Sequence, residues 1–142
     1  MKRMKIIILI LLFSLKAFAP SEKVMYILRS QSEISRPYEK IWNAVVAVES
    51  GGDPFAVGDK HMEEYSYGIA QIRQIRIDHY NDLTGCNLRL VDVYDPEISK
   101  EVFMYFATGF RPDDYEGISK AWNGSKTDKY WNKVKKHLAV QN

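Results

Sequence analysis

"PYEKIWNAVVAVESGG" spans residues 37–52 and decides the fold of this chain. Proline is tolerated at the first position of an α-helix, so Pro37 predicts a helix start. Large apolar side chains then cover most of the surface of that helix: Ile41, Trp42, Val45, Val46 and Val48. A helix that is apolar on most sides is buried, and the two glycines end this one. We therefore expect a central helix over 37–50.

The last turn of this helix carries a single carboxylic acid, Glu49. The C-terminal end of a helix dipole is negative and disfavours a carboxylate, and apolar neighbours disfavour the charged form further. Both effects raise the pKa, and a carboxyl group that keeps its proton near neutral pH can act as a general acid. Glu49 is therefore a candidate catalytic acid. The alternative is an ordinary solvated glutamate at a helix end.

Four more helices are predicted downstream. One covers about residues 70–83, with Gly85 beyond its end. Asp95 can cap the next helix and Pro96 fits its first turn, while Gly109 ends it. The apolar face of that helix consists of Ile98, Val102, Phe103, Tyr105 and Phe106.

The last two helices begin near residues that cap helices well. Asp113 or Asp114 begins a helix that Gly124 closes, and Thr127 can cap the final one. The final helix has an inward face of Tyr130, Trp131, Val134 and Leu138. Residues 57–68 leave room for one or two short strands, so the predicted fold class is mainly α with at most a minor β-hairpin.

Composition predicts one globular domain. The chain has 142 residues, of which 46% are hydrophobic and 27% charged. Cys86 is the only cysteine, so no disulfide can form within the chain, and we expect a small buried side chain there. The histidines and acids between residues 61 and 79 do not have the spacing of a zinc motif, so we predict no metal and no cofactor.

The N-terminus has the three parts of a secretory signal. Residues 1–5 are mostly basic or polar, residues 6–15 are almost all apolar, and residues 17–19 read Ala-Phe-Ala, the form of a signal-peptidase site. Ten residues are too few to span a bilayer comfortably. Lys16 precedes the site and Pro20 follows it, so an uncleaved inner-membrane anchor is the alternative.

These features divide the chain into a signal peptide or anchor (1–19), a lead-in (20–36) and one domain (37–142), exported to the periplasm or the cell exterior. Without residues 1–19 the chain has 16 basic and 18 acidic side chains, a balance that argues against nucleic-acid binding driven by charge. One basic cluster is left near the C-terminus: Lys126, Lys129, Lys133, Lys135 and Lys136. We expect a solvated helix face there, with a contact for an acidic polymer as the alternative.

Three short segments stand in order along the domain. They are Glu49-Ser50-Gly51-Gly52, Tyr67-Gly68-Ile69-Ala70-Gln71-Ile72 and Ala121-Trp122-Asn123-Gly124. Each is weak alone, but together they resemble the pattern of the lytic transglycosylases and goose-type lysozymes. The resemblance covers about residues 38–137. It implies a lysozyme-like helical domain that acts on the glycan strands of peptidoglycan without a cofactor.

The resemblance also implies roles for individual residues. Glu49 would be the sole acid and base, protonating the oxygen between N-acetylmuramic acid and N-acetylglucosamine while the substrate's N-acetyl group supports the positive centre. It would then take the proton of the muramoyl C6 hydroxyl, which attacks C1 and leaves a 1,6-anhydro end. Ser50 would support the acid or its loop, and residues 68–71 would form the opposing wall of the cleft. The substrate-binding residues would be Ser50, Tyr67, Gln71, Trp122, Asn123 and Tyr130.

The chain departs from the family pattern at two positions. Trp122 stands where the family often has a tyrosine whose hydroxyl lies near the catalytic acid, and indole cannot accept a hydrogen bond. Ala70 stands where the family has methionine, which removes a bulky side chain from the cleft wall. Both changes bear on substrate positioning more than on the reaction class.

Two other functions stay open. Asp59, Glu63 or Glu64, between the first two segments, would make the protein a water-using muramidase if one of them served as a second carboxylate. A non-catalytic peptidoglycan-binding module is the other alternative, although binding alone does not need Glu49. By analogy, a domain of this size suggests local cleavage that makes room for an envelope-spanning machine.

Overall fold

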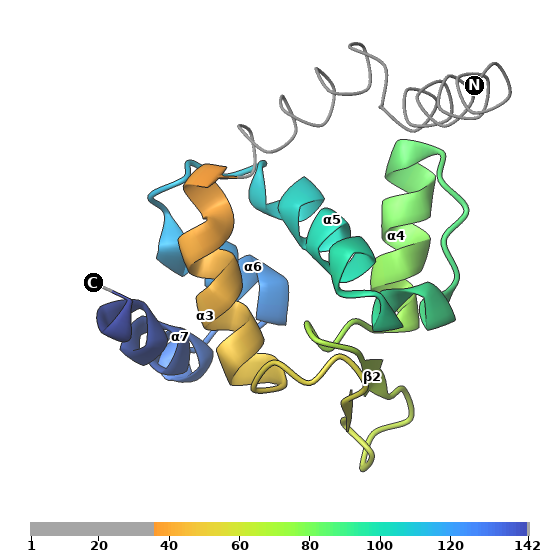
Figure 1. The fold of residues 1–142 in the computed structure, drawn as a ribbon, viewed down its shortest axis with the longest axis horizontal. Coiled ribbons are helices and arrows are strands. Elements are labelled where there is room, and N and C mark those ends of the chain that lie inside the picture. Colours follow the sequence, from red (N-terminus) through yellow and green to blue (C-terminus); the bar gives the residue numbers. More distant parts are fainter. Residues whose placement is uncertain (1–35, 142) are drawn as a thin grey trace, which may run out of the picture. The chain divides into compact units, whose positions relative to one another are not determined.

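The computed structural model describes residues 36–141. The predicted signal peptide and all of the lead-in except Arg36 lie outside the described residues, so these assignments stay predictions. The described part contains five α-helices and one two-stranded antiparallel sheet (Figure 1). The mainly α fold with a minor β-hairpin is therefore confirmed.

The helix predicted at 37–50 lies at the centre of the fold as α3 (Glu39–Glu49). Ile41 and Val45 are fully buried, and the Trp42 ring packs against Phe103 with ring centroids 5.2 Å apart. Burial of such side chains contributes about 1.5–3 kcal/mol each. The apolar sequence of α3 thus becomes the main packing surface of the domain.

The other elements follow in chain order. They are η1 (Arg36–Tyr38), β1 (Val57–Gly58), β2 (Ser66–Tyr67), α4 (Gln74–Thr84), η2 (Leu90–Tyr94), α5 (Pro96–Ala107), α6 (Tyr115–Asn123) and α7 (Asp128–Val140). β1 and β2 pair antiparallel, with Val57 opposite Tyr67 and Gly58 opposite Ser66. The two strands at 57–68 are therefore confirmed, each two residues long.

Three predicted helix starts are confirmed. Asp95 Oδ1 accepts a hydrogen bond from the backbone N–H of Glu97 at 2.9 Å, and Asp114 Oδ1 accepts one from Gly117 at 2.9 Å. These bonds satisfy N–H groups that have no partner within the helix. α7 begins directly after Thr127, although the Thr127 hydroxyl makes no capping bond.

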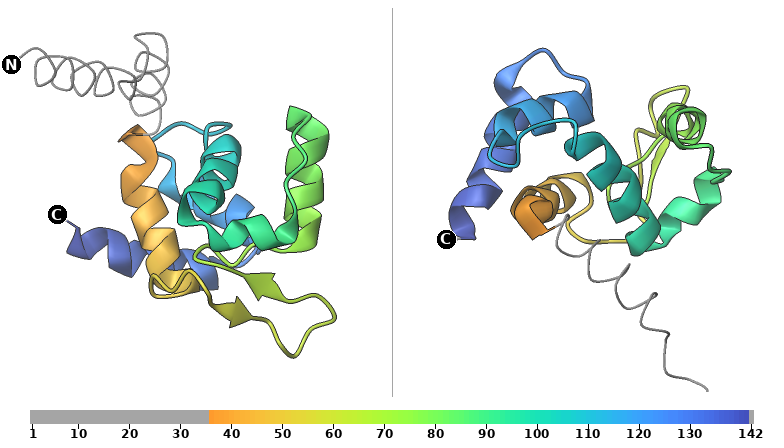
Figure 2. Two further views of the ribbon diagram at one scale, coloured as in Figure 1. Left: turned by 45° about the vertical axis from the view of Figure 1, so that its right-hand side comes forward. Right: turned by 90° about the horizontal axis from the view of Figure 1, so that it is seen from above.

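The helices fall into two groups on either side of α5. α3 packs against α5, α6 and α7, while α4 lies beside α5 away from α3 (Figures 1 and 2). Tyr80 attaches α4 to α5: its hydroxyl donates to Glu101 at 2.7 Å, and its ring meets Tyr105 edge-on with centroids 5.3 Å apart. This arrangement brings the hairpin and the start of α4 opposite the end of α3.

The second predicted helix begins about four residues later than expected. α4 starts at Gln74, not near Ala70. Gln71 has a φ of 53°, which no right-handed helix contains, and Ile72 pairs with Tyr67 in an isolated β-bridge. The residues expected to form a first helical turn instead form a tight turn beside the sheet.

The expectation that Cys86 is buried is wrong, because this cysteine is exposed. Gly85, with a φ of 73°, ends α4, and Asn81 closes the following loop by two hydrogen bonds to the backbone of Leu88, at 2.8 and 2.9 Å. The loop holds Cys86 away from the core. Tyr105, expected on the apolar face of α5, is also exposed in part, at 39%.

The lysines near the C-terminus form an exposed face of α7 and the residues before it, as predicted. All five are exposed: Lys126, Lys129, Lys133, Lys135 and Lys136.

None of the helices within residues 36–141 is long and apolar enough to cross a membrane.

Candidate active site

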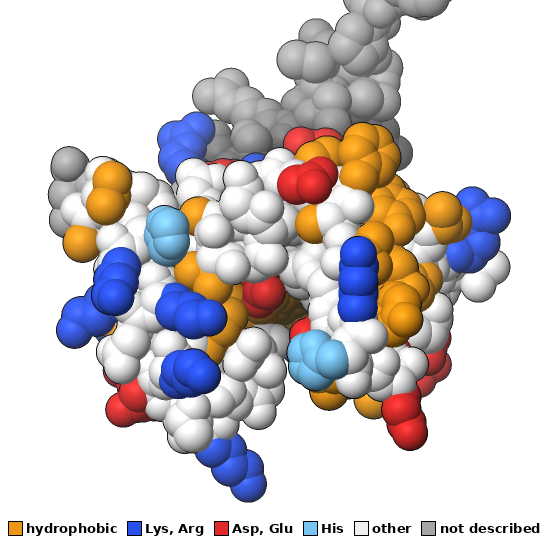
Figure 3. Space-filling view, turned by 90° about the horizontal axis from the view of Figure 1, so that it is seen from below, with side chains coloured by type: hydrophobic (Ala, Val, Ile, Leu, Met, Phe, Trp, Pro, Cys, Tyr) orange, Lys and Arg blue, Asp and Glu red, His pale blue; other side chains and the backbone are white. Residues whose placement is uncertain are grey.

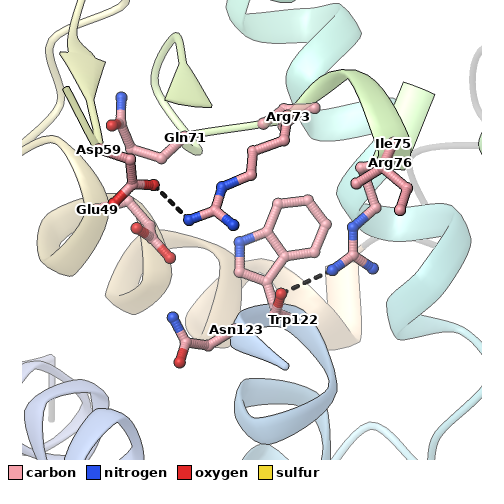
Figure 4. Close-up of a pocket in the computed structure, with 9 residues that line it drawn as sticks. Glu49, Asp59, Gln71, Arg73, Ile75, Arg76, Trp122 and Asn123 are labelled. Carbon is pink, nitrogen blue, oxygen red and sulfur yellow. Dashed lines mark hydrogen bonds and ion pairs between the residues drawn. The ribbon is translucent and has the colours of Figure 1, made fainter. Parts of the chain in front are cut away.

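A pocket of about 160 Å³ lies where the end of α3 meets the hairpin and α4. Its lining residues are Glu49, Asp59, Gln71, Ile72, Arg73, Ile75, Arg76, Trp122 and Asn123 (Figure 4). Sites that enclose a drug-sized ligand are larger, about 300–1,000 Å³, so this pocket holds only part of a large ligand.

The pocket has two walls of different construction. We call Glu49, Trp122 and Asn123, with Tyr130 behind them, the helical wall, because they belong to α3, α6 and α7. We call Asp59 and residues 71–76 the loop wall, because most of them belong to the hairpin loop and the turn before α4.

Figure 3 looks onto the molecule from below, where an acidic side chain is visible in a central hollow and basic side chains gather to its left, over α7.

Glu49 is the central group of the helical wall. Burial first, and the negative charge of Asp59 to a smaller extent, raise the pKa of this carboxyl from 4.5 to about 7. The Tyr130 hydroxyl donates to Glu49 Oε1 at 2.6 Å and opposes the rise. The prediction of a carboxyl group with a raised pKa is confirmed, and burial is its main cause.

Trp122 is both a core residue and part of the pocket. It is 8% exposed and packs edge-on against Phe103, with ring centroids 5.0 Å apart. The Arg76 guanidinium lies 4.7 Å from the Trp122 ring and donates from Nη2 to the Trp122 carbonyl at 2.7 Å. A cation at the C-terminal end of α6 is favoured by the helix dipole, so Arg76 holds this end of the wall in place. Asn123 follows as an exposed residue at the rim.

Trp122 has no hydroxyl group that could bond to Glu49. The hydroxyl comes from Tyr130 on α7 instead, 81 residues along the chain. Tyr130 is 7% exposed, so packing holds its ring while its hydroxyl holds the carboxyl. Tyr130 thus contacts the candidate acid from behind and is not among the residues that line the pocket.

Gln71 lines the loop wall in a left-handed conformation. Its Nε2 donates to the carbonyls of Ala56, at 3.2 Å, and Gly68, at 2.9 Å, while its Oε1 accepts from Ser66 at 2.8 Å. Both amide protons are therefore engaged within the protein. Gly58 lies close beside this amide, and a Cβ there would overlap Gln71 Oε1 unless the amide moved. The sequence-predicted residue is in the pocket, and here it braces the turn.

Ser50 connects the two walls. Its hydroxyl donates to the Ile69 carbonyl at 2.7 Å and accepts from the Gly52 N–H at 3.1 Å. Gly51 and Gly52, with φ angles of 67° and 93°, let the chain turn directly after α3, as predicted. Ser50 thus supports the loop, one of the two roles expected for it.

Asp59 is the only one of the three candidate second carboxylates that lines the pocket. Its Oδ2 accepts from Arg73 Nη2 at 2.7 Å, and this hydrogen bond lowers the pKa of the Asp59 carboxyl. Glu64 instead accepts from the Ile75 N–H at 3.1 Å, at the start of α4, and Glu63 is exposed outside the pocket. Neither Glu63 nor Glu64 is among the residues that line the pocket with Glu49.

Tyr67 does not line the pocket, although the resemblance implied a contact with the glycan. It is half-buried in β2, and its ring lies 6.5 Å from Tyr65 and 6.2 Å from Tyr94, measured between centroids. Four lining residues were not predicted as site residues: Ile72, Arg73, Ile75 and Arg76. Their position at the end of the second segment or directly after it was the signal that could have indicated them.

Within residues 36–141, no group of three or more His, Cys, Asp or Glu side chains lies close enough to hold a metal ion. Comparisons of this chain with protein-family models, with curated proteins and with solved structures found no match.

Proposed function

We propose that this protein is a lytic transglycosylase with a lysozyme-like helical domain. The observation that carries the proposal is the half-buried Glu49 carboxyl, which lines an open pocket and whose pKa is raised to about 7. Each of the three family-like segments supplies at least one lining residue, Glu49, Gln71 and Trp122 respectively. The substrate is the β-1,4 bond between N-acetylmuramic acid and N-acetylglucosamine in peptidoglycan.

The reaction needs one carboxyl group in two protonation states. Glu49 gives its proton to the bridging oxygen as the bond from C1 to that oxygen breaks. The substrate's N-acetyl group supports the positive charge at C1. The Glu49 carboxylate then takes the proton of the C6 hydroxyl, whose oxygen bonds to C1, so that a 1,6-anhydro end forms and no water is consumed. A pKa near 7 suits a group that must donate and accept a proton in one cycle.

Two neighbours support this role. The Tyr130 hydroxyl, 2.6 Å from Oε1, sets the orientation of the carboxyl, and it can donate to either protonation state. Trp122 forms an apolar wall beside it and limits the access of water. No cofactor or metal takes part in this mechanism.

One observation favours a second candidate, a water-using muramidase. Asp59 lines the same pocket as Glu49, and inverting hydrolysis requires a second carboxylate that activates a water. The ion pair with Arg73 opposes this role, because a carboxylate with a lowered pKa is a weaker base. A non-catalytic glycan-binding module is the third candidate, but it gives no reason for a buried acid in the pocket.

Digestion of purified peptidoglycan separates the three candidates. Mass spectrometry of the released muropeptides distinguishes 1,6-anhydro ends from reducing ends, which are heavier by one water. We expect anhydro ends from the protein and none from Glu49→Gln; Glu63→Gln, an exposed acid outside the pocket, is the matched control. Reducing ends would identify a muramidase. Binding without release, unchanged in Glu49→Gln, would identify a binding module.

This substrate lies outside the cytoplasmic membrane, which agrees with the export predicted from residues 1–19. We propose a periplasmic or extracellular location, or an inner-membrane anchor if the segment is not cleaved. N-terminal sequencing of the exported protein tests the point, since cleavage leaves Pro20 as the first residue.

A further inference from the structure

The pocket contains a second carboxylate, Asp59, which forms an ion pair with Arg73. Asp59 and Glu49 both line it and are close enough for the charge of Asp59 to act on the Glu49 proton. Asp59 Oδ2 is bound to Arg73 Nη2 at 2.7 Å. The same Nη2 lies 3.3 Å from Met62 Sδ, so two groups of the hairpin loop hold one guanidinium nitrogen.

The backbone is in an uncommon conformation at Asp59 and at Gln71, two residues before Arg73. Asp59 has a φ of 54° and Gln71 one of 53°, and they are the only non-glycine residues with positive φ within 36–141. Such conformations are uncommon and persist where the surrounding structure enforces them. Arg73 stands at the N-cap of α4, and its carbonyl accepts from Arg76 at 3.0 Å. Its guanidinium reaches into the pocket between Asp59 and the Trp122 ring (Figure 4).

We propose that Arg73 is a positioning residue that decides which nucleophile completes the reaction, by engaging Asp59 so that it cannot activate a water. The inference rests on the proposed function, since it assumes cleavage at Glu49. With Asp59 engaged, the C6 hydroxyl of the substrate is the nucleophile, and Glu49 serves as both acid and base.

The two reactions differ in the nucleophile that bonds to C1 and in the group that takes its proton. In the anhydro reaction the C6 oxygen bonds to C1, the bond from C1 to the bridging oxygen breaks, and Glu49 exchanges both protons. In hydrolysis a water oxygen bonds to C1 instead, Glu49 protonates the bridging oxygen, and Asp59 takes the proton of the water. A released Asp59 carboxylate would supply the base that the second route needs.

The test compares product ratios in Arg73→Met, Arg73→Lys and the double variant Arg73→Met/Asp59→Asn. General-base catalysis contributes about 10²–10⁴-fold to a rate, so we expect Arg73→Met to raise the ratio of reducing to anhydro ends by about tenfold or more. Arg73→Lys keeps a cation beside Asp59 and restores most of the anhydro product. The double variant removes the released base and returns to anhydro ends. An unchanged ratio in active Arg73→Met would overturn the inference.

Arg89→Met is the matched control. Arg89 forms an ion pair with Asp92, Nη2 to Oδ1 at 3.0 Å, outside the pocket, so its loss should leave both rate and product ratio unchanged. If Arg73→Met does not fold, as judged by thermal melting, Asp59→Asn in the unaltered background carries the test. This variant should still release anhydro ends, with no rise in the ratio of reducing to anhydro ends, because Asp59 supplies no base there. A folded but inactive Asp59→Asn would assign Asp59 a direct part and overturn the inference.

The result for the unaltered protein is independent of these variants. If it releases reducing ends or nothing, the proposed function fails. If it releases anhydro ends and Arg73→Met does the same, only the inference about Arg73 fails.

Discussion

The two walls of the pocket hold their side chains by different forces. In the helical wall, Glu49 and Tyr130 belong to helices whose apolar faces pack together, and Val45 and Val134 are fully buried beneath them. In the loop wall, Ile72 is buried, but an ion pair and the bonds of one amide, Gln71, hold the short turns around it together. Packing gives a rigid, water-poor setting for a proton, whereas polar contacts leave charged groups exposed to a ligand.

Of the changes considered for the two walls, we expect the largest loss of activity from a substitution of Glu49, the acid of the helical wall. Glu49→Gln removes the only protonated carboxyl proposed for the reaction, so peptidoglycan cleavage should fall by about 10³-fold or more. Initial rates of muropeptide release measure it. A residual rate above a tenth of the original would contradict the assignment of Glu49.

Two isoleucines test the packing difference directly. Ile41 in α3 is 0% exposed and Ile75 in the loop wall is 68% exposed. Ile41→Ala should lower the free energy of unfolding by about 2–5 kcal/mol, whereas Ile75→Ala should change it by less than about 0.5 kcal/mol. Urea denaturation measures both. Equal losses would show that the loop wall is packed as firmly as the helical wall.

The buried acid makes stability depend on pH. The folded pKa of Glu49, about 7, lies above the unfolded value of 4.5, so the folded state holds the proton more tightly. Stability is therefore lost as the pH rises from 4.5 to 7, and above pH 7 the cost amounts to about 3 kcal/mol. Glu49→Gln should be more stable than the original protein at pH 8 and equal to it at pH 4. Thermal melts at the two pH values measure the difference, and an equal gain at both would refute the buried-charge explanation.

The smallest expected effect is a shift in the alkaline limb of the pH profile, and the two walls should move it in opposite directions. Tyr130→Phe removes a bond that lowers the pKa of Glu49, so the limb should move to higher pH. Asp59→Asn removes a negative charge that raises this pKa, so the limb should move to lower pH. Profiles of kcat/KM between pH 5 and 9 report both shifts. Shifts in the same direction would disprove opposing control by the two walls.

Much of the helical wall could be predicted because its signals are local. The apolar run of α3, the caps at Asp95 and Asp114 and the glycines after Glu49 each act within a few residues. The loop wall was predicted less well. Residues 70–73 have the composition of a helix start, but the left-handed Gln71 is stabilised by contacts with Ser66 and with Ala56, which lies 15 residues away in the sequence.

The sequence by itself determined the mainly α class, the central helix and an acid at its end with a raised pKa, because helix periodicity, capping and burial are encoded over short distances. The tertiary structure alone decided which groups surround that acid. It placed the hydroxyl of Tyr130 on Glu49, put Arg73 against Asp59 and left Tyr67 outside the pocket. These contacts join residues 14 to 81 positions apart, and their geometry depends on how whole helices and turns pack.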